Sequence, residues 1–371
     1  MSAQSQFRLF GERRFLPFFC AQLLGAFNDN LYKNALVILV TFQAASWTSM
    51  DPALLANVAA GLFILPFVLF SALGGQMADR FDKAVLIRVI KFAEIPIMGL
   101  AGLGFARGDV TLLMAALFLM GTQSAFFGPV KYAILPQVLR EKELIGGNAL
   151  VETGTFLAIL AGTLCAGLLA AGGDRGVILT TVLAVALVGF AASLWVPRTG
   201  PASPGLRLDW NPLTAALGNV RYARASRPVF LSILGISWFW AYGAAVLAQL
   251  PSLASAVLGG NEQVVTALLS VFSVGVGAGS LLCERLSGHK VEIGLVPFGS
   301  IGLTLFGVDL YLVTHDFPAG QALTPLALLA QPDGWRVYAD LALIGLFGGL
   351  YIVPLYATVQ LRSDAAERSR I

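Results

Sequence analysis

The chain has 371 residues, of which 57% are hydrophobic and only 12% are charged, and its formal net charge is +3. A soluble globular domain carries about 25% charged residues, so this composition excludes an ordinary soluble protein and indicates one that lies in a bilayer. The basic residues lie in short connections between apolar segments and therefore do not indicate a nucleic-acid partner. The three cysteines, Cys20, Cys165 and Cys283, are dispersed and form no CxxC pair, which argues against a disulfide framework or a metal site.

Ten apolar segments of about 20 residues recur along the chain, each long enough to cross a hydrocarbon core of about 30 Å. They are predicted at residues 15–46, 53–75, 84–106, 110–131, 147–171, 175–196, 228–254, 263–285, 292–314 and 336–360. The sequence therefore predicts an all-α, multi-pass membrane protein.

The first apolar segment is interrupted by polar side chains between Asn28 and Asn34. A charge near the bilayer centre costs at least roughly 2.5–3.5 kcal/mol, so such residues usually face the interior of a helix bundle and mark a pathway. Asp29 and Lys33 are four residues apart and share one face of a helix, and Asn30 and Asn34 form a second pair beside them. This pattern predicts one wall of a polar cavity. The alternative is that Asp29 and Lys33 pair with each other and fix the position of the first helix.

The distribution of basic residues predicts that the N-terminus is cytoplasmic. Of the 24 Lys and Arg residues, Lys33 lies within the first segment, and Arg107, Arg175 and Arg336 fall on the far side. The other 20 fall on the side of the N-terminus.

The longest polar connection covers residues 197–227 and opens with the linker-like stretch Pro-Arg-Thr-Gly-Pro-Ala-Ser-Pro-Gly. Apolar residues then recur at helical spacing beside Arg221 and Arg224, namely Trp210, Leu213, Ala216, Leu217 and Val220. They predict a basic amphipathic helix along the cytoplasmic surface of the membrane, with a solvated linker helix as the alternative.

An internal repeat relates the two sides of this linker. Gly74, Asp79 and Arg80 recur 205 positions later as Gly279, Glu284 and Arg285. Equivalent loops on one membrane face imply parallel repeats related by an axis along the membrane normal. We therefore predict a six-helix N-terminal bundle over 1–196, a linker over 197–227 and a second bundle over 228–371. Because only four segments follow the linker, we expect the second bundle to be truncated after four of six helices.

The loop Gly75-Gln-Met-Ala-Asp-Arg-Phe-Asp-Lys83 resembles the GxLADRxGRK loop of the major facilitator superfamily, with Asp82 in place of the usual glycine. The stretches Gln22–Ala35 and Phe127–Tyr132 are similar to the lysophospholipid transporter branch of that superfamily. The second half resembles relatives whose transporter domain is fused to an acyltransferase and an acyl-activating ligase. It departs from single-domain relatives because the seventh segment carries no charge between Phe230 and Pro251, which leaves headgroup contacts to Trp238, Trp240, Tyr242 or Gln249.

The resemblance implies a transporter that moves lysophospholipid across the bacterial inner membrane to the cytoplasmic side by alternating access, and so supplies reacylation. A lysophosphatidylethanolamine headgroup presents an ammonium, a phosphate and a hydroxyl, and each needs a partner in a low-dielectric cavity. We expect Asp29 to bind the ammonium and Lys33 the phosphate. The other expected substrate-binding residues are Asn30, Asn34, Gln123, Glu152 and Trp238. A lateral opening between the bundles would leave the acyl chain in the lipid.

Other polar residues are expected to be structural or to form a gate. Lys91 and Glu94 are predicted to pair with each other. For Gln123 and its neighbour Ser124, the alternative to a place in the cavity is a polar contact between helices. Charged residues of the repeated loops are predicted to pair when the cytoplasmic side is closed and to separate when it opens, namely Asp79, Arg80, Lys83, Glu284 and Arg285.

Two other functions compete with lysophospholipid transport. One is a major facilitator exporter of drugs or of a small polar solute, coupled to protons through Asp29. The other is an enzyme, but neither His289 nor His315 belongs to the His-x4-Asp pair of common lipid acyltransferases. We therefore expect no catalytic residue, no metal and no cofactor in this chain, and place any acyltransferase in a fused or associated partner.

Overall fold

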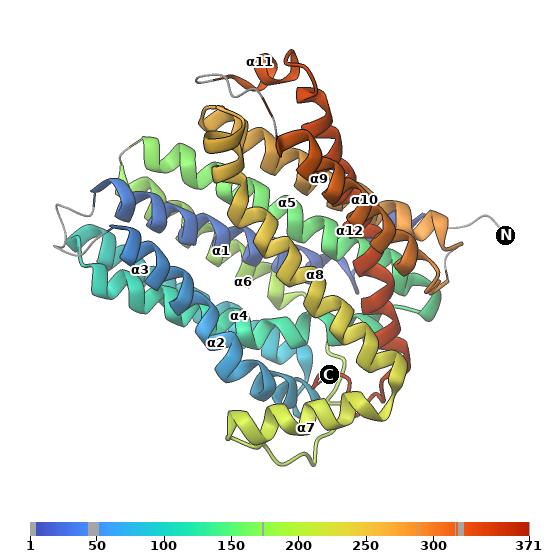
Figure 1. Ribbon diagram of the computed structural model, residues 1–371. Helices are drawn as coiled ribbons and strands as arrows, with labels where there is room; N and C mark the ends of the chain where they lie inside the picture. The colour runs from blue at the N-terminus through green and yellow to red at the C-terminus, as the bar shows by residue number, and fades with distance from the viewer. Residues whose placement is uncertain are drawn as a thin grey trace. The chain divides into compact units, whose positions relative to one another are not determined.

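The computed structural model describes residues 5–43, 52–172, 174–288, 290–315, 317 and 323–370. Across these residues, ten helices of 20 or more residues form at the ten predicted positions (Figure 1). They are α1 (Leu16–Gln43), α2 (Pro52–Arg80), α3 (Lys83–Arg107), α4 (Val110–Val138), α5 (Leu144–Ala171), α6 (Arg175–Leu194), α8 (Arg227–Ser252), α9 (Glu262–Leu286), α10 (Leu295–His315) and α12 (Gly334–Arg362). The prediction of an all-α fold is confirmed.

Shorter helices connect the long ones. They are the 3-10 helices η1 (Gln6–Gly11) and η3 (Glu141–Glu143), the π-helical turn η4 (Leu253–Val257), α7 (Pro212–Ala225) and α11 (Pro325–Leu329). Helix α7 is the helix predicted in the linker.

Within the described residues, eight helices are long and apolar enough to cross a membrane, namely α2, α4, α5, α6, α8, α9, α10 and α12. Helices α1 and α3 are not among these eight. Helix α1 carries Asp29 and Lys33, and helix α3 carries Lys91 and Glu94. The architecture is that of a multi-pass membrane protein in which α1 and α3 carry charged side chains within their apolar segments.

The chain divides into two compact units. Unit 1 consists of Met1–Gln6, Glu141–Leu160 and Pro228–Leu361, and unit 2 of Phe7–Arg140, Ala161–Arg227 and Arg362–Ile371. Helix α5 thus contributes its first part to unit 1 and its second part to unit 2. The predicted bundle boundaries at residues 196 and 227 stay a prediction.

In unit 2, α2 packs along α4, while α3 packs against α4 and α6, and α1 against α6. Tyr32 of α1 is fully buried, and its hydroxyl donates to the carbonyl oxygen of Leu113 at 2.8 Å. A Cβ on Gly121 of α4 would overlap the carbonyl oxygen of Phe63, so α2 and α4 approach at backbone distance. The Tyr32 hydrogen bond fixes α1 against α4 and thereby orients its polar face.

In unit 1, α9 and α12 cross in backbone contact. A Cβ on Gly275 or Gly279 of α9 would overlap carbonyl oxygens of α12. A Cβ on Gly345 or Gly349 of α12 would overlap carbonyl oxygens of α9 in the same way. Only glycine permits such a close crossing, which is a common packing mode of membrane helices.

Asp82, which stands where the resembling loop has glycine, begins α3. Its Oδ1 accepts hydrogen bonds from the backbone N–H groups of Ala84 at 2.9 Å and Val85 at 3.2 Å. Its Oδ2 accepts from the linker N–H groups of Thr199 at 3.0 Å and Gly200 at 2.6 Å. One carboxylate therefore caps a helix and also holds the start of the linker.

We expect Asp82→Ala to lower the free energy of unfolding by about 1–2 kcal/mol through loss of the cap, and also to release the linker. Limited trypsin digestion should then cut faster at Arg198, which is already exposed. The matched control is Asp109→Ala, because Asp109 caps α4 through the N–H groups of Thr111 and Leu112, and both of these hydrogen bonds stay within that helix. Equal cleavage rates at Arg198 in the two variants would contradict a role of Asp82 in holding the linker.

Candidate substrate site and gating loop

A connected set of six polar side chains from α1, α3 and α4 forms the centre of unit 2, namely Asn28, Asp29, Lys91, Glu94, Gln123 and Ser124. Lys91 Nζ lies 2.7 Å from Glu94 Oε2, and both side chains are only 1% exposed. Glu94 also accepts hydrogen bonds from the amide of Asn28 at 2.7 Å and from that of Gln123 at 3.4 Å. The predicted structural pair of Lys91 and Glu94 is confirmed, and it is the core of this network.

Asp29 is the acidic member of the network that is not fully buried. Its side chain is partly exposed, whereas Glu94 is buried. The hydroxyl of Ser124 donates to Asp29 Oδ2 at 2.5 Å and lies 3.2 Å from Gln123 Oε1. Ser124 and Gln123 therefore join the carboxylate of Asp29 to the buried ion pair of Lys91 and Glu94.

The other predicted polar residues of α1 lie on the adjacent turns. Lys33 Nζ donates to Asn30 Oδ1 at 3.2 Å and lies 5.3 Å from the ring centroid of Phe63, at cation–π distance. The amide of Asn34 donates to the hydroxyl of Thr163 on α5 at 2.9 Å. Asp29 and Lys33 take different partners, and in the part of the chain that the structure describes no ion pair joins them. They are thus two separate charges of opposite sign on neighbouring turns.

Glu152 and Trp238 belong to unit 1. Glu152 of α5 is fully buried, while Trp238 of α8 is 45% exposed. The Trp238 ring stacks on Tyr242 at 5.2 Å between centroids and meets Tyr351 edge-on at 5.6 Å. The remaining predicted substrate residues, Asp29, Asn30, Lys33, Asn34 and Gln123, all belong to unit 2.

Asp79, the first of the predicted gate residues, is fully buried at the end of α2. Its Oδ2 accepts from Arg370 Nε at 2.9 Å, and its Oδ1 accepts from the backbone N–H of Ser369 at 3.1 Å. A Cβ on Gly75 would lie 2.9 Å from the Cα of Arg370, so this contact needs glycine on α2. We call this contact of Asp79 with Ser369 and Arg370 the latch.

Arg370 of the latch also touches the linker helix. Its guanidinium carbon lies 4.9 Å from the ring centroid of Tyr222 on α7. Nearby, the hydroxyl of Ser203 in the linker donates to the carbonyl oxygen of Ala366 at 2.9 Å. The segment that follows α12 is therefore held to α2, to the linker and to α7 together.

Glu284, the repeat counterpart of Asp79, also accepts a backbone N–H. The N–H of Gln6 donates to Glu284 Oε2 at 3.1 Å, and the Gln6 side-chain amide donates to the carbonyl of Leu281 at 3.1 Å. The other predicted gate residues lie differently. Arg80 lies 5.4 Å from the Phe81 ring, Lys83 is 1% exposed and Arg285 is exposed.

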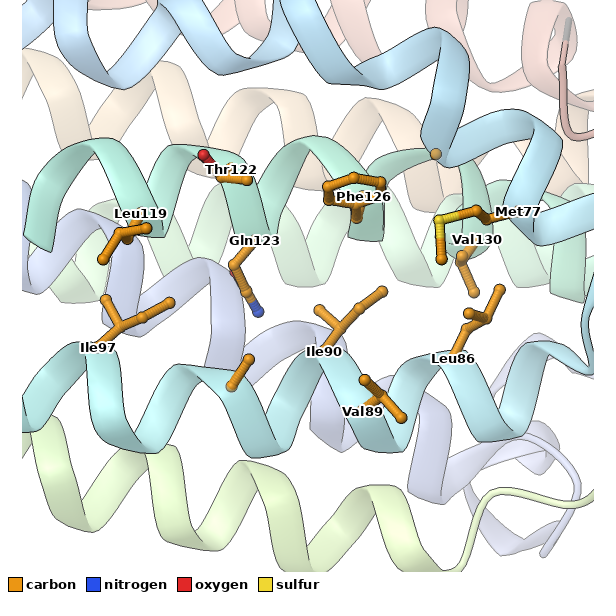
Figure 2. A pocket seen from close by; sticks show the side chains of 12 residues that line it. Met77, Leu86, Val89, Ile90, Ile97, Leu119, Thr122, Gln123, Phe126 and Val130 are labelled. Atoms are coloured by element: carbon orange, nitrogen blue, oxygen red, sulfur yellow. The ribbon is translucent and has the colours of Figure 1, made fainter. Parts of the chain in front are cut away.

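An apolar pocket of about 300 Å³ opens between α2, α3 and α4. Figure 2 shows Leu86 and Ile90 from α3 and Phe126 and Val130 from α4 pointing into the same space, with the amide of Gln123 reaching toward α3. The volume is at the lower end of the range for small-molecule pockets, about 300–1,000 Å³. Gln123 both lines this pocket and donates to Glu94, so it separates an apolar space from the buried charges.

Several contacts of the predicted site residues could not be found from sequence spacing. Asn28 and Ser124 complete the network, Ser369 and Arg370 bind Asp79, and Gln6 binds Glu284. Ser124 carried a weak signal, as a polar residue beside Gln123 within an apolar segment. Gln6 and Arg370 carried none, because each lies in a short polar segment without a periodic pattern.

Comparison with known proteins gives a consistent result. The model of the Major Facilitator Superfamily matches residues 18–371. The lysophospholipid transporter LplT of Klebsiella pneumoniae is 28% identical over 355 residues, which cover 94% of this chain and 80% of that protein. LplT of Serratia proteamaculans is 29% identical over 359 residues, with the same coverage of 94% and 80%.

Solved structures share the fold at low identity. FucP, a Major Facilitator Superfamily transporter in the outward conformation, matches with a TM-score of 0.65 and 14% identity over 97% of this chain and 87% of that chain. A bacterial homologue of the iron transporter ferroportin in an outward-facing state matches with a TM-score of 0.63 and 15% identity over 95% of this chain and 86% of that chain.

Proposed function

This chain belongs to the major facilitator superfamily, and from that premise we propose that it carries lysophospholipid across the bacterial inner membrane to the cytoplasmic side by alternating access. The relatives named LplT support the substrate class. The observation that carries the proposal is the pair of partly exposed opposite charges, Asp29 and Lys33, on adjacent turns of α1. A zwitterionic headgroup presents the complementary pair of charges.

The binding site we propose is prepared before the headgroup arrives. Ser124 holds the Asp29 carboxylate in place for the ammonium, and Asn30 holds the Lys33 ammonium for the phosphate. Asn34 and Gln123 supply hydrogen bonds to the glycerol hydroxyls. Supporting hydrogen bonds of this kind fix charged side chains, so less ordering is left for the binding step. Glu152 and Trp238 are proposed to line the pathway from unit 1.

We propose that the latch at Asp79 and its counterpart at Glu284 form the cytoplasmic gate, with Arg80, Lys83 and Arg285 as the remaining charges of the two loops. Each acid accepts a backbone N–H from a distant part of the chain, Ser369 for Asp79 and Gln6 for Glu284. Alternating access requires contacts that form in one state and break in the other. The moving parts proposed are a six-helix bundle over 1–196 and a second bundle over 228–371 with four helices, joined by the linker 197–227.

The orientation proposed places the N-terminus in the cytoplasm, so that transported lipid arrives on the side where reacylation takes place. That step would fall to an acyltransferase, fused or associated.

We expect Asp29→Asn and Lys33→Ala each to slow lysophosphatidylethanolamine uptake by about 10- to 100-fold, because each removes one charge-assisted contact of about 1.5–3 kcal/mol. Uptake of labelled lipid into vesicles that contain the purified protein measures the rate. The matched control is Asp109→Asn, which removes a carboxylate from the N-cap of α4 but keeps a side chain that caps well. Unaltered uptake in both Asp29→Asn and Lys33→Ala would contradict the headgroup assignment.

The exporter alternative has one observation in its favour, since Asp29 is a titratable group within reach of the pathway. It predicts transport that depends on a pH gradient and no uptake of lysophospholipid by the unsubstituted protein. The same vesicles, with and without an imposed pH gradient, distinguish the two functions.

A further inference from the structure

Helix α7 presents a row of large apolar side chains on its outer side. Trp210 and Leu213 are each 73% exposed and Leu217 is 69% exposed. Leu213, Leu217 and Val220 are spaced by four and three residues, so they share one face of the helix. We call Trp210, Leu213, Leu217 and Val220 the apolar ridge.

Two small residues of α7 are buried where this helix packs on unit 2. Ala215 and Ala223 are each 4% exposed, and α7 contacts α2. At 3.6 residues per turn, Ala215 lies about 200° around the helix from Leu213, which is nearly the far side. A solvated linker helix would bury its large apolar residues against its own domain. Helix α7 instead leaves Leu213 and Leu217 exposed while it buries Ala215 and Ala223, so unit 2 does not cover the apolar ridge.

The start of α7 is rigidly held. Asn211 caps the helix through the N–H of Leu213 at 3.0 Å, and Pro212 occupies the first turn. The backbone N–H of Asp209 donates to Gln76 Oε1 of α2 at 2.7 Å. Hydrogen bonds from Thr214 and Asn211 lower the pKa of the Asp209 carboxyl, so it stays anionic and fixes this turn. The apolar ridge is therefore presented in one orientation.

The sequence that follows α7 places this helix at a membrane boundary. Only Ser226 separates the last residue of α7, Ala225, from the first residue of α8, Arg227, where a candidate membrane span begins (Figure 1). Exposed arginines flank the apolar ridge, namely Arg207, Arg221 and Arg227. Leucine and tryptophan beside arginine are typical of helices that lie in the headgroup region of anionic membranes.

We propose that α7 lies in the plane of the membrane surface, with its apolar ridge at the boundary of the acyl chains and its arginines on anionic lipid headgroups. The occupant of this surface is the bilayer itself, in particular a lipid with a net negative headgroup such as phosphatidylglycerol. The assignment is independent of the transported substrate, because no residue of the proposed substrate site belongs to α7.

The fluorescence of Trp210 tests this in the full chain. A variant with Phe in place of Trp47, Trp195, Trp238, Trp240 and Trp335 keeps Trp210 as the single tryptophan. In phosphatidylcholine vesicles we expect blue-shifted emission and quenching by lipids brominated near the headgroup end of the acyl chain. Both effects should increase when phosphatidylglycerol is added.

Two variants separate the apolar and the charged contributions. Leu213→Ser with Leu217→Ser should lose the blue shift, while Thr214→Ser with Ala216→Ser, on the same helix, should keep it. Arg221→Gln should lose the response to phosphatidylglycerol only. In the unsubstituted protein, tryptic cleavage after Arg221 should be slower in vesicles with phosphatidylglycerol than without, which needs no folding of a variant.

Water-like emission of Trp210 that bromine does not quench, in both kinds of vesicle, would overturn the proposal that α7 lies in the membrane surface. An equal response with and without phosphatidylglycerol, together with equal tryptic cleavage, would overturn the proposed preference for anionic lipid.

Discussion

Replacing Lys91 with methionine should lower the free energy of unfolding by about 3–5 kcal/mol, because it leaves the carboxylate of Glu94 in the protein interior without its cation. Both side chains are 1% exposed, so water cannot compensate the lost partner. The amides of Asn28 and Gln123 still donate to Glu94, but neither carries a charge. Unfolding in detergent, followed by heat or by denaturant, measures the loss.

A second variant and a control sharpen this expectation. Lys91→Met combined with Glu94→Leu removes both charges and should recover most of the lost stability. Arg336→Gln breaks ion pairs with Asp309 at 2.7 Å and with Asp333 at 3.1 Å in which every side chain is at least 35% exposed, so it should cost much less stability than Lys91→Met. If Lys91→Met costs no more than Arg336→Gln, the buried pair does not stabilise unit 2 as described.

Asp79→Asn should weaken the latch by about 3–5 kcal/mol, which favours release of the 362–370 segment by more than about 100-fold. Asp79 is fully buried and Arg370 is 9% exposed, so loss of the carboxylate leaves a guanidinium with little access to water. Ser369 is 6% exposed next to it. In a chain whose three native cysteines are replaced, Ser369→Cys should react slowly with a maleimide, and adding Asp79→Asn should make the reaction fast.

The matched control for the latch is Glu367→Gln. Glu367 lies 3.8 Å from another nitrogen of the same arginine and is 33% exposed, so its loss should change the labelling rate little. Equal labelling rates for the Asp79→Asn and Glu367→Gln variants would show that the carboxylate of Asp79 does not hold the segment.

The long helices were predictable because their signal is local. A run of about 20 apolar residues has few folded alternatives in a bilayer, so each predicted segment contains or overlaps an observed helix. The linker helix was predictable from the spacing of Leu213, Leu217 and Val220 alone. The first residue of this helix was less predictable, since Trp210 belongs to the apolar pattern but precedes the helix, which begins at Pro212.

The candidate site was predictable only on one side. The periodicity of α1 brings Asp29, Asn30, Lys33 and Asn34 to neighbouring positions, but it cannot say what they face. Their partners include Ser124, 95 positions further along the chain from Asp29, and Thr163, 129 positions from Asn34. These contacts arise from helix packing, which one sequence does not encode as a pattern. For the same reason the repeat identified Asp79 and Glu284 but not Arg370 or Gln6.

The contact between Tyr222 and Arg370 has a mechanical consequence. Arg370 touches the Tyr222 ring on one side and the Asp79 carboxylate on another, so it cannot leave α2 without also changing its contact with α7. Any displacement of α7 relative to α2 therefore changes the contacts of the Arg370 guanidinium. Through this one side chain, the last turn of the linker helix is coupled mechanically to the end of α2 at Asp79.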